Sequence, residues 1–183
     1  LAGFTILIPL AFVGFPLLWM VLSSLTPDKY LFDDSFLPPT ITLNHYVELF
    51  NKTDFGLFFL NSVIVAIIAT SICVGTAVLA AYSVSRFGLR FNLQRTMLLI
   101  YALPPVLLVI PILILFSKLG LTNSYAGVAL GHASLMLPFS TLILISYFNN
   151  IPKELDEAAL VDGCSRFGAL FKIIIPLALP GIV

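Results

Sequence analysis

The sequence predicts an all-α protein that crosses a membrane several times. Hydrophobic residues make up 60% of the 183 residues, charged residues make up 10%, and the mean hydropathy is +1.08. A soluble domain has about 45–50% apolar and about 25% charged residues, so an ordinary soluble domain is excluded. The charges are gathered in short islands. The apolar stretches between them exceed the roughly 20 residues that a helix needs to cross the hydrocarbon of a bilayer.

We predict four spanning helices and the start of a fifth, at residues 4–24, 58–82, 96–116, 125–148 and 173–183. Backbone groups in lipid must pair within the protein, and the alternation typical of barrel strands is absent, so helices are favoured over strands. A cleaved signal peptide is the alternative for the first span, but its apolar stretch is too long. The sequence has no initiator Met and stops inside an apolar run, so we expect the chain to continue beyond both ends of one transmembrane domain, residues 1–183.

The charges of the loops predict the orientation of the chain, because basic residues are retained on the cytoplasmic side. The loop with Arg86, Arg90 and Arg95 and the loop at residues 149–172 are predicted to be cytoplasmic. Residues 25–54 carry five acidic residues against two lysines and are predicted to be external, which places the N-terminus in the cytoplasm. We expect the three arginines to anchor the chain at the inner headgroups.

A short helix is predicted within the external segment, from Asn44 to Asn51, after the helix-breaking pair Pro38-Pro39. Apolar residues alternate in it with His45 and Glu48, so it is amphipathic. It either lies on the outer membrane face or forms one packed turn of a solvated connector.

Several kinds of chemistry are excluded. Nine basic and nine acidic residues balance, so there is no general basic surface for nucleic acid. The two cysteines, Cys73 and Cys164, stand alone and form neither a metal-binding pair nor a disulfide framework. Motifs for nucleotide binding, zinc hydrolysis and nucleophilic catalysis are missing. We therefore expect no catalytic residue, no metal and no cofactor in this chain.

Two features of the spans favour a translocation pathway. The third span contains three residues that remove backbone donors and bend a helix, Pro104, Pro105 and Pro111. Polar side chains at Asn61, Tyr101 and His132 are candidates to line a substrate path. The alternatives are a packing kink for the prolines, an interhelical contact for Asn61 and for a neutral His132, and an interfacial aromatic position for Tyr101.

The loop at residues 149–172 is predicted to form a helical hairpin. Its first helix runs from Pro152 to Asp162, with Asn149 or Asn150 as its cap, acidic residues in its first turn and Gly163 at its stop. One face of this helix carries Leu155, Ala158, Ala159 and Asp162. The second helix begins at Ser165, ends at Pro176 and carries an apolar stripe of Phe167, Leu170, Phe171 and Ile174. The hairpin either docks another protein or lies flat in the headgroups.

This loop resembles the EAA loop of binding-protein-dependent ABC importers. Glu157-Ala158-Ala159 is followed after three residues by Gly163 and after nine more by the stretch from Ile173 to Pro176, with Ile175 where the family has Leu. In that family the loop inserts into a cleft on the ATP-binding subunit. The resemblance, with the predicted helix face, implies the docking residues Glu157, Ala158, Ala159, Asp162, Gly163 and Pro176.

Other segments resemble the carbohydrate-uptake permeases, and in particular the second of their two permease subunits. These segments are residues 40–50, the pair Asn61-Ser62 and residues 82–92. The resemblance implies a type I importer in the plasma membrane of a bacterium or archaeon. Its other parts are a homologous permease, two ATPase subunits that bind ATP and Mg, and an external sugar-binding protein.

The alternative is a secondary transporter or channel without an ATPase, and a structural scaffold is a third interpretation. A secondary transporter favours acidic residues in its spans for ion coupling, and the four predicted spans contain none.

Overall fold

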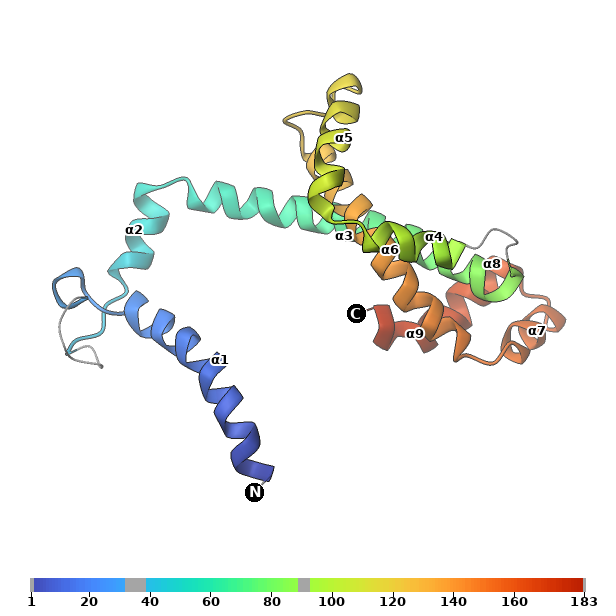
Figure 1. Cartoon of the computed structure of the whole chain (residues 1–183), viewed down its shortest axis with the longest axis horizontal. Helices are drawn as coiled ribbons and strands as arrows, with labels where there is room; N and C mark the ends of the chain where they lie inside the picture. The colour runs from blue at the N-terminus through green and yellow to red at the C-terminus, as the bar shows by residue number, and fades with distance from the viewer. Residues whose placement is uncertain (1, 32–38, 89–92, 183) are drawn as a thin grey trace. The chain divides into compact units, whose positions relative to one another are not determined.

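The computed structural model describes residues 2–31, 39–88 and 93–182, with side chains in the first helix from Pro9 onward. All regular structure within these ranges is helical, and none of it is a strand (Figure 1). The all-α prediction is therefore confirmed. The chain divides into two compact units, residues 1–60 and 61–183.

The first unit holds helix α1 (Ala2–Ser24), a 3₁₀ turn (η1, Asp28–Tyr30) and helix α2 (Asn44–Lys52). Polar contacts fasten α2 to the end of α1. A ring nitrogen of His45 lies 2.8 Å from the carbonyl oxygen of Thr26, and the hydroxyls of Tyr46 and Ser24 lie 2.7 Å apart. The predicted short external helix is thus confirmed as a helix, one residue longer than expected, and its polar face packs on the preceding chain.

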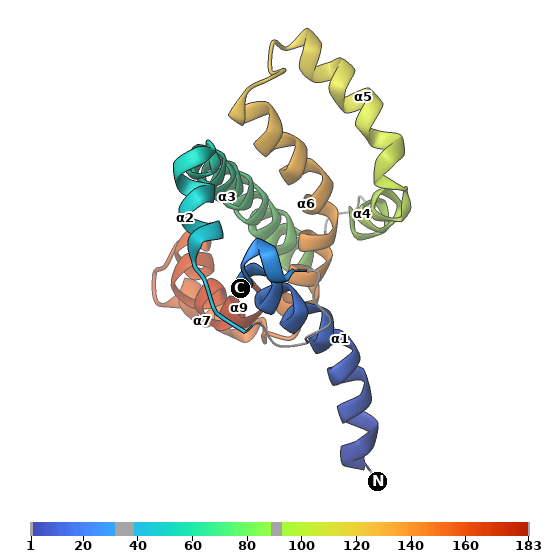
Figure 2. The same ribbon diagram turned by 90° about the vertical axis from the view of Figure 1, so that its left-hand side faces the viewer.

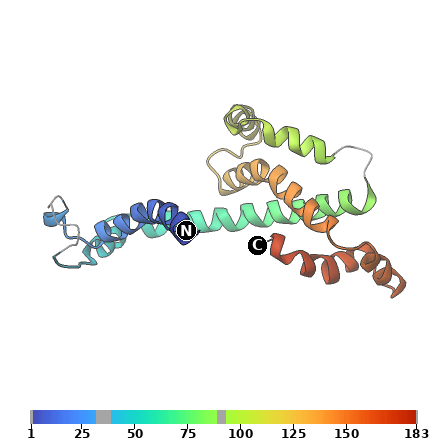
Figure 3. The same ribbon diagram turned by 60° about the horizontal axis from the view of Figure 1, so that its bottom comes forward.

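The second unit contains the remaining helices. The first of them, α3, begins at Phe55 in the first unit and continues into the second. In chain order they are α3 (Phe55–Phe87), α4 (Leu93–Ala102), α5 (Pro105–Lys118), α6 (Tyr125–Asn149), α7 (Glu154–Val161), α8 (Arg166–Ala169), a π turn (η2, Leu170–Ile174) and α9 (Ile175–Ile182). Helix α4 packs beside α6, and α9 packs back against α6 (Figures 2 and 3).

Two of the four expected spans are confirmed as helices long and apolar enough to cross a membrane, namely α3 and α6. The third span was expected as one bent helix, but it is two helices, α4 and α5, that meet at an angle of 101° and count as one span only when taken together. The described apolar part of α1, Pro9–Ser24, is shorter than the other two. Four complete spans are therefore not confirmed.

The break in the third span lies where the sequence predicts it. Pro104 has a φ of −57° and a ψ of 125°, an extended conformation that a residue before proline prefers, and Pro105 begins α5 as its first residue. Pro111, in contrast, lies inside α5 without ending it. Only the paired prolines break the helix.

The core of the second unit lies at the end that carries the loop, where α3, α6 and the segment from η2 to α9 meet. Small residues let these helices approach closely, because Ala77, Ala81 and Ala178 are fully buried beside Phe148. The rest of this core is Val78, Tyr82, Leu144, Ile145, Leu170 and Ile174.

The second helix of the hairpin does not end at Pro176, and this expectation is wrong. Helix α8, the π turn and α9 follow one another without a break, and Pro176 is the second residue of α9. Pro176 directly follows the π turn, in which the amide of Ile175 donates to the carbonyl of Leu170 five residues back; this shift in hydrogen-bond register lets the helix run on through a residue that has no amide proton. The expected apolar stripe is also divided: Leu170 and Ile174 are buried, whereas Phe167 and Phe171 are exposed.

Candidate docking loop and polar cavity

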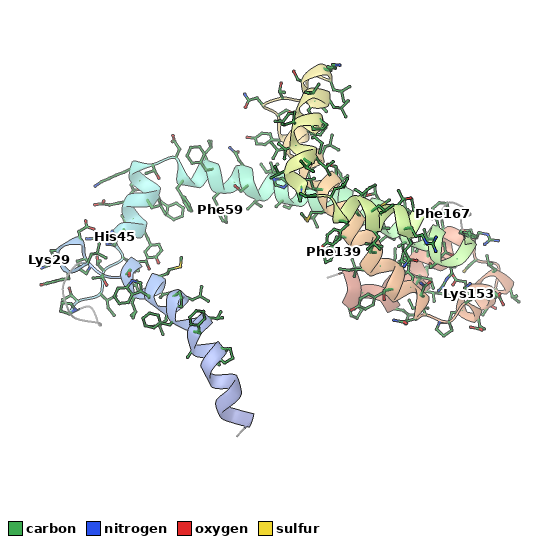
Figure 4. All side chains as sticks on the ribbon, viewed as in Figure 1. Lys29, His45, Phe59, Phe139, Lys153 and Phe167 are labelled. Atoms are coloured by element: carbon green, nitrogen blue, oxygen red, sulfur yellow. The ribbon has the colours of Figure 1, made fainter. Side chains whose placement is uncertain are left out.

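Helix α7 forms the first arm of the predicted hairpin, within two residues of the expected bounds. Its first turn carries three acidic residues, which suit the positive end of the helix dipole. The expected asparagine cap is wrong, because Asn149 is the last residue of α6 and Asn150 is the C-cap of α6. Lys153 stands at the start of α7 without a side-chain cap, and it lies at the same end of the unit as Phe167 (Figure 4).

The turn between α7 and α8 is fixed by backbone hydrogen bonds. Gly163 ends the helix as predicted, and its φ of +81° is the left-handed conformation that commonly follows a helix. Its amide donates to the carbonyl of Leu160 over 3.1 Å, and the amide of Cys164 donates to the carbonyl of Ala159 over 2.9 Å, the two bonds of a Schellman motif. The hydroxyl of Ser165 then accepts from the amide of Gly168 and caps α8.

The residues expected to form one docking face lie on two sides of the hairpin. Ala159 is 3% exposed and packs inward, so it belongs to the underside of α7 and not to a shared face. Glu157, Ala158, Asp162 and Gly163 are exposed, and so are Leu155 and, on α9, Pro176.

A buried charge network lies under α7, and sequence reasoning missed it. The hydroxyl of Tyr82 donates to Oδ1 of Asp156 over 2.9 Å, and Nε of Arg86 lies 2.6 Å from Oδ2. This ion pair is held by charge attraction, because its atoms are not aligned as a hydrogen bond. The side chains of Arg86 and Asp156 are only 5% and 11% exposed.

Arg86 also binds the end of α6. Its two terminal nitrogens donate to the carbonyl oxygens of Phe148 and Ile151, each over 3.1 Å. The expectation that Arg86 anchors the chain at the headgroups is therefore wrong, because the side chain points into the protein. Arg90 lies outside the described residues. The one signal of this network in the sequence is that Tyr82 and Arg86 are four residues apart, on one face of a helix.

A cavity of about 790 Å³ lies between α3 and α6. Among its lining residues are two of the predicted pathway residues, Asn61 and His132. The hydroxyl of Tyr125 donates to Oδ1 of Asn61 over 2.7 Å, so Asn61 also joins α3 to α6. Further polar groups on the wall come from Ser62, Thr70, Cys73 and Ser140.

Tyr101 does not share this cavity. It lines a smaller one of about 300 Å³ formed by α4, α5 and α6, and its ring stacks on that of Phe139 with centroids 5.3 Å apart. Phe139 and Met136 line both cavities, so α6 is the wall between them. The three predicted pathway residues are thus divided between two sites. Among the described residues, three potential metal ligands of the His, Cys, Asp and Glu type do not come together.

Comparisons with known proteins identify the family of this chain. Residues 73–183 match the family described as "Binding-protein-dependent transport system inner membrane component". The sulfoquinovosyl glycerol transport system permease protein SmoH of Agrobacterium fabrum is 35% identical over 172 residues, which are 92% of this chain and 60% of that protein. The trehalose/maltose transport system permease protein MalG of Thermococcus litoralis is also 35% identical over 172 residues, covering 92% of this chain and 62% of that protein.

A solved structure has the same fold. It is the crystal structure of a bacterial ABC transporter involved in the import of the acidic polysaccharide alginate, with a TM-score of 0.79 and 22% identity. The match covers 99% of this chain and 65% of that chain. The chain spans about three fifths of the length of the two permeases named above. It is a multi-pass membrane protein that belongs to the family of binding-protein-dependent transport system inner membrane components.

Proposed function

We propose that the chain is the permease subunit of an ATP-driven importer for a sugar or oligosaccharide, and that it docks an ATP-binding subunit through residues 149–172. The single observation that carries this proposal is the stiff, exposed hairpin of α7 and α8. A turn fixed by a Schellman motif and a serine cap holds its geometry when another protein pushes on it.

The outer side of the hairpin has the chemistry of a docking surface. Glu157 and Asp162 are exposed acidic groups, and Ala158 between them lets a partner backbone approach closely. A carboxylate that meets a basic group or an amide donor of the ATP-binding subunit forms a charge-assisted hydrogen bond, which is stronger than a neutral one. The buried underside of α7 supports this surface from within.

The cavity between α3 and α6 supports a role as part of the substrate path. Amide, hydroxyl and imidazole groups of Asn61, Tyr125 and His132 suit the hydroxyl groups of a sugar, because each can donate or accept a hydrogen bond. Helices α3, α4, α5 and α6 contain no Asp or Glu that could couple a proton or cation to transport, which favours the importer over a secondary transporter or channel. Tyr101 belongs to a second cavity and is a weaker candidate for this path.

The complete importer on this proposal has several further parts. They are a homologous permease, two ATP-binding subunits that hold ATP and Mg, and an external sugar-binding protein. ATP hydrolysis takes place in those partner subunits. The complex lies in the plasma membrane with the hairpin and the N-terminus of this chain in the cytoplasm. The names of the relatives, which include permeases for trehalose/maltose and for a sulfoquinovosyl glycerol, support a carbohydrate substrate.

The test is capture of the complex from native membranes through a tag on the permease, followed by identification of the ATP-binding subunit and measurement of ATP hydrolysis. Glu157→Ala should reduce the amount of ATP-binding subunit that is captured, whereas Lys153→Ala at the start of the same helix should leave it unchanged. Trehalose and maltose are the first sugars to offer in an uptake assay. A wild-type protein that captures no ATP-binding subunit would contradict the proposal.

A further inference from the structure

The buried underside of α7 joins the hairpin to two membrane helices at one point. The fixed turn at Gly163 joins α7 to α8, and α7 also packs on α8 and η2. Asp156 adds an attachment to a membrane helix, because its two carboxylate oxygens contact Tyr82 and Arg86, residues one turn apart on α3. Helix α7 is thereby held to a single turn of α3.

The guanidinium group of Arg86 extends this attachment to α6. Its Nε contacts the carboxylate of Asp156 on α7, and its terminal nitrogens hydrogen bond the carbonyls of Phe148 and Ile151 where α6 ends. One side chain therefore holds α3, the end of α6 and α7 together. Because guanidinium is planar and its donors are fixed in direction, a tilt of α7 must move the ends of α3 and α6 or separate buried charges.

The two helices held at this point are those that line the larger cavity. From Arg86 to Asn61 along α3 is 25 residues, or about 38 Å at 1.5 Å per residue. A small tilt at the loop end of a straight helix becomes a larger displacement at the cavity. The loop end is also where the core is packed, so a displacement of one helix there should shift its packed neighbours with it.

A charge pair is an unusual choice for simple stability at this position. Well-packed apolar residues commonly stabilise a core as well as a buried ion pair does, whereas separating the partners of a buried ion pair leaves uncompensated charge and is strongly unfavourable. We propose that Arg86 and Asp156 form the joint that passes movement of α7 to α3 and α6, with Tyr82 as a positioning residue for the carboxylate. This proposal rests on the proposed docking of an ATP-binding subunit at the hairpin.

The experiment uses Cys73, which lines the cavity and is buried, as its reporter. A Cys164→Ser background removes the other thiol of residues 1–183, and alkylation of the peptide that contains Cys73 by N-ethylmaleimide is followed by mass spectrometry. The captured complex is labelled without nucleotide and with Mg-ATP. The joint variant is Asp156→Asn, and its matched control is Glu154→Gln, the same change of carboxylate to amide at an exposed position of α7.

We expect the rate of Cys73 alkylation to change with Mg-ATP in the parent and in Glu154→Gln. In Asp156→Asn this nucleotide response should be lost while ATP hydrolysis per captured complex is retained. A residue with a merely structural role would lower the yield of complex but leave the response of each assembled complex unchanged.

The remaining outcomes also decide the question. Arg86→Lys keeps a charge but loses the fixed fork, and Tyr82→Phe loses one hydrogen bond but keeps the ion pair, so both should weaken the response. If Asp156→Asn does not assemble, Tyr82→Phe decides, and a full response in it would overturn the joint. A parent complex that hydrolyses ATP with no response at Cys73 would overturn it as well. A parent that captures no ATP-binding subunit refutes the proposed function instead.

Discussion

Replacement of Gly163 should destabilise the hairpin turn, and the free energy lost should depend only on how readily the new residue adopts the backbone conformation of this position. Its φ is +81°, and no atom lies within 4 Å of the position that a Cβ would take, so an added side chain meets no steric clash. The whole cost is that of a left-handed conformation, about 1–2 kcal/mol for Ala. Asn reaches this region more readily than Ala, and β-branched Val least readily. The free energy lost on replacing Gly163 should therefore increase from Asn to Ala to Val.

Hydrogen exchange of the Cys164 amide measures this cost directly, because that amide is bonded to the carbonyl of Ala159 across the turn. A loss of about 1.4 kcal/mol speeds exchange of a locally opening amide by roughly tenfold, which is the size expected for Gly163→Ala. Gly75→Ala is the control, since it adds the same methyl group in open space at a helical position of α3. Equal exchange rates in the Asn, Ala and Val variants would refute the argument from φ, and so would slower exchange in Val than in Asn.

Three further changes test other parts of the structure. Asp156→Leu should lower the free energy of unfolding by about 3–5 kcal/mol, because it leaves the charge of Arg86 buried without its partner. The thermal midpoint of the purified protein should fall accordingly, and an unchanged midpoint would contradict this. Gly127→Ala should lower the free energy of unfolding by about 1–3 kcal/mol, since the new Cβ would lie 2.1 Å from a backbone oxygen. Its control, Gly131→Ala, makes only an ordinary contact at 3.6 Å and should leave the thermal midpoint unchanged. A cysteine at Asp33, outside the described residues, should react with an impermeant reagent in intact cells; protection from it would reverse the predicted topology.

The fold was largely predictable because its signals are local. Uncharged apolar runs mark α3 and α6, and paired prolines mark the break between α4 and α5 at Pro104. The hairpin was equally readable, since an acidic first turn and a glycine stop define α7 to within two residues. The error at Pro176 has a local cause too, because a π turn that lets a helix run on through a proline has no signature in the sequence.

The site was only partly predictable, since its central contact joins residues far apart in sequence. Asp156 is 70 residues from Arg86 in sequence. It is one of three acidic residues in the first turn of α7, a pattern that predicts an exposed carboxylate near the positive end of the helix dipole. The burial of Ala159 follows from the same contact, because Asp156 turns that side of α7 inward. The separation of Tyr101 from Asn61 depends on how α6 passes between two cavities, which a single sequence does not encode locally.

The π turn at Leu170–Ile174 makes this stretch tolerant of a one-residue deletion in a way that its neighbours are not. A π turn accommodates one more residue than an α turn, so removal of one residue would convert it to regular helix. Because the wide turn absorbs that residue, the helix after it should keep its rotation, whereas a deletion within an α turn rotates the following residues by about 100°. Gly181, where an added Cβ would lie 2.4 Å from the ring of Tyr147, would keep its place against α6 in the first case and lose it in the second. One-residue deletions in lineages of this chain should therefore fall in the π turn and not in α8 or α9.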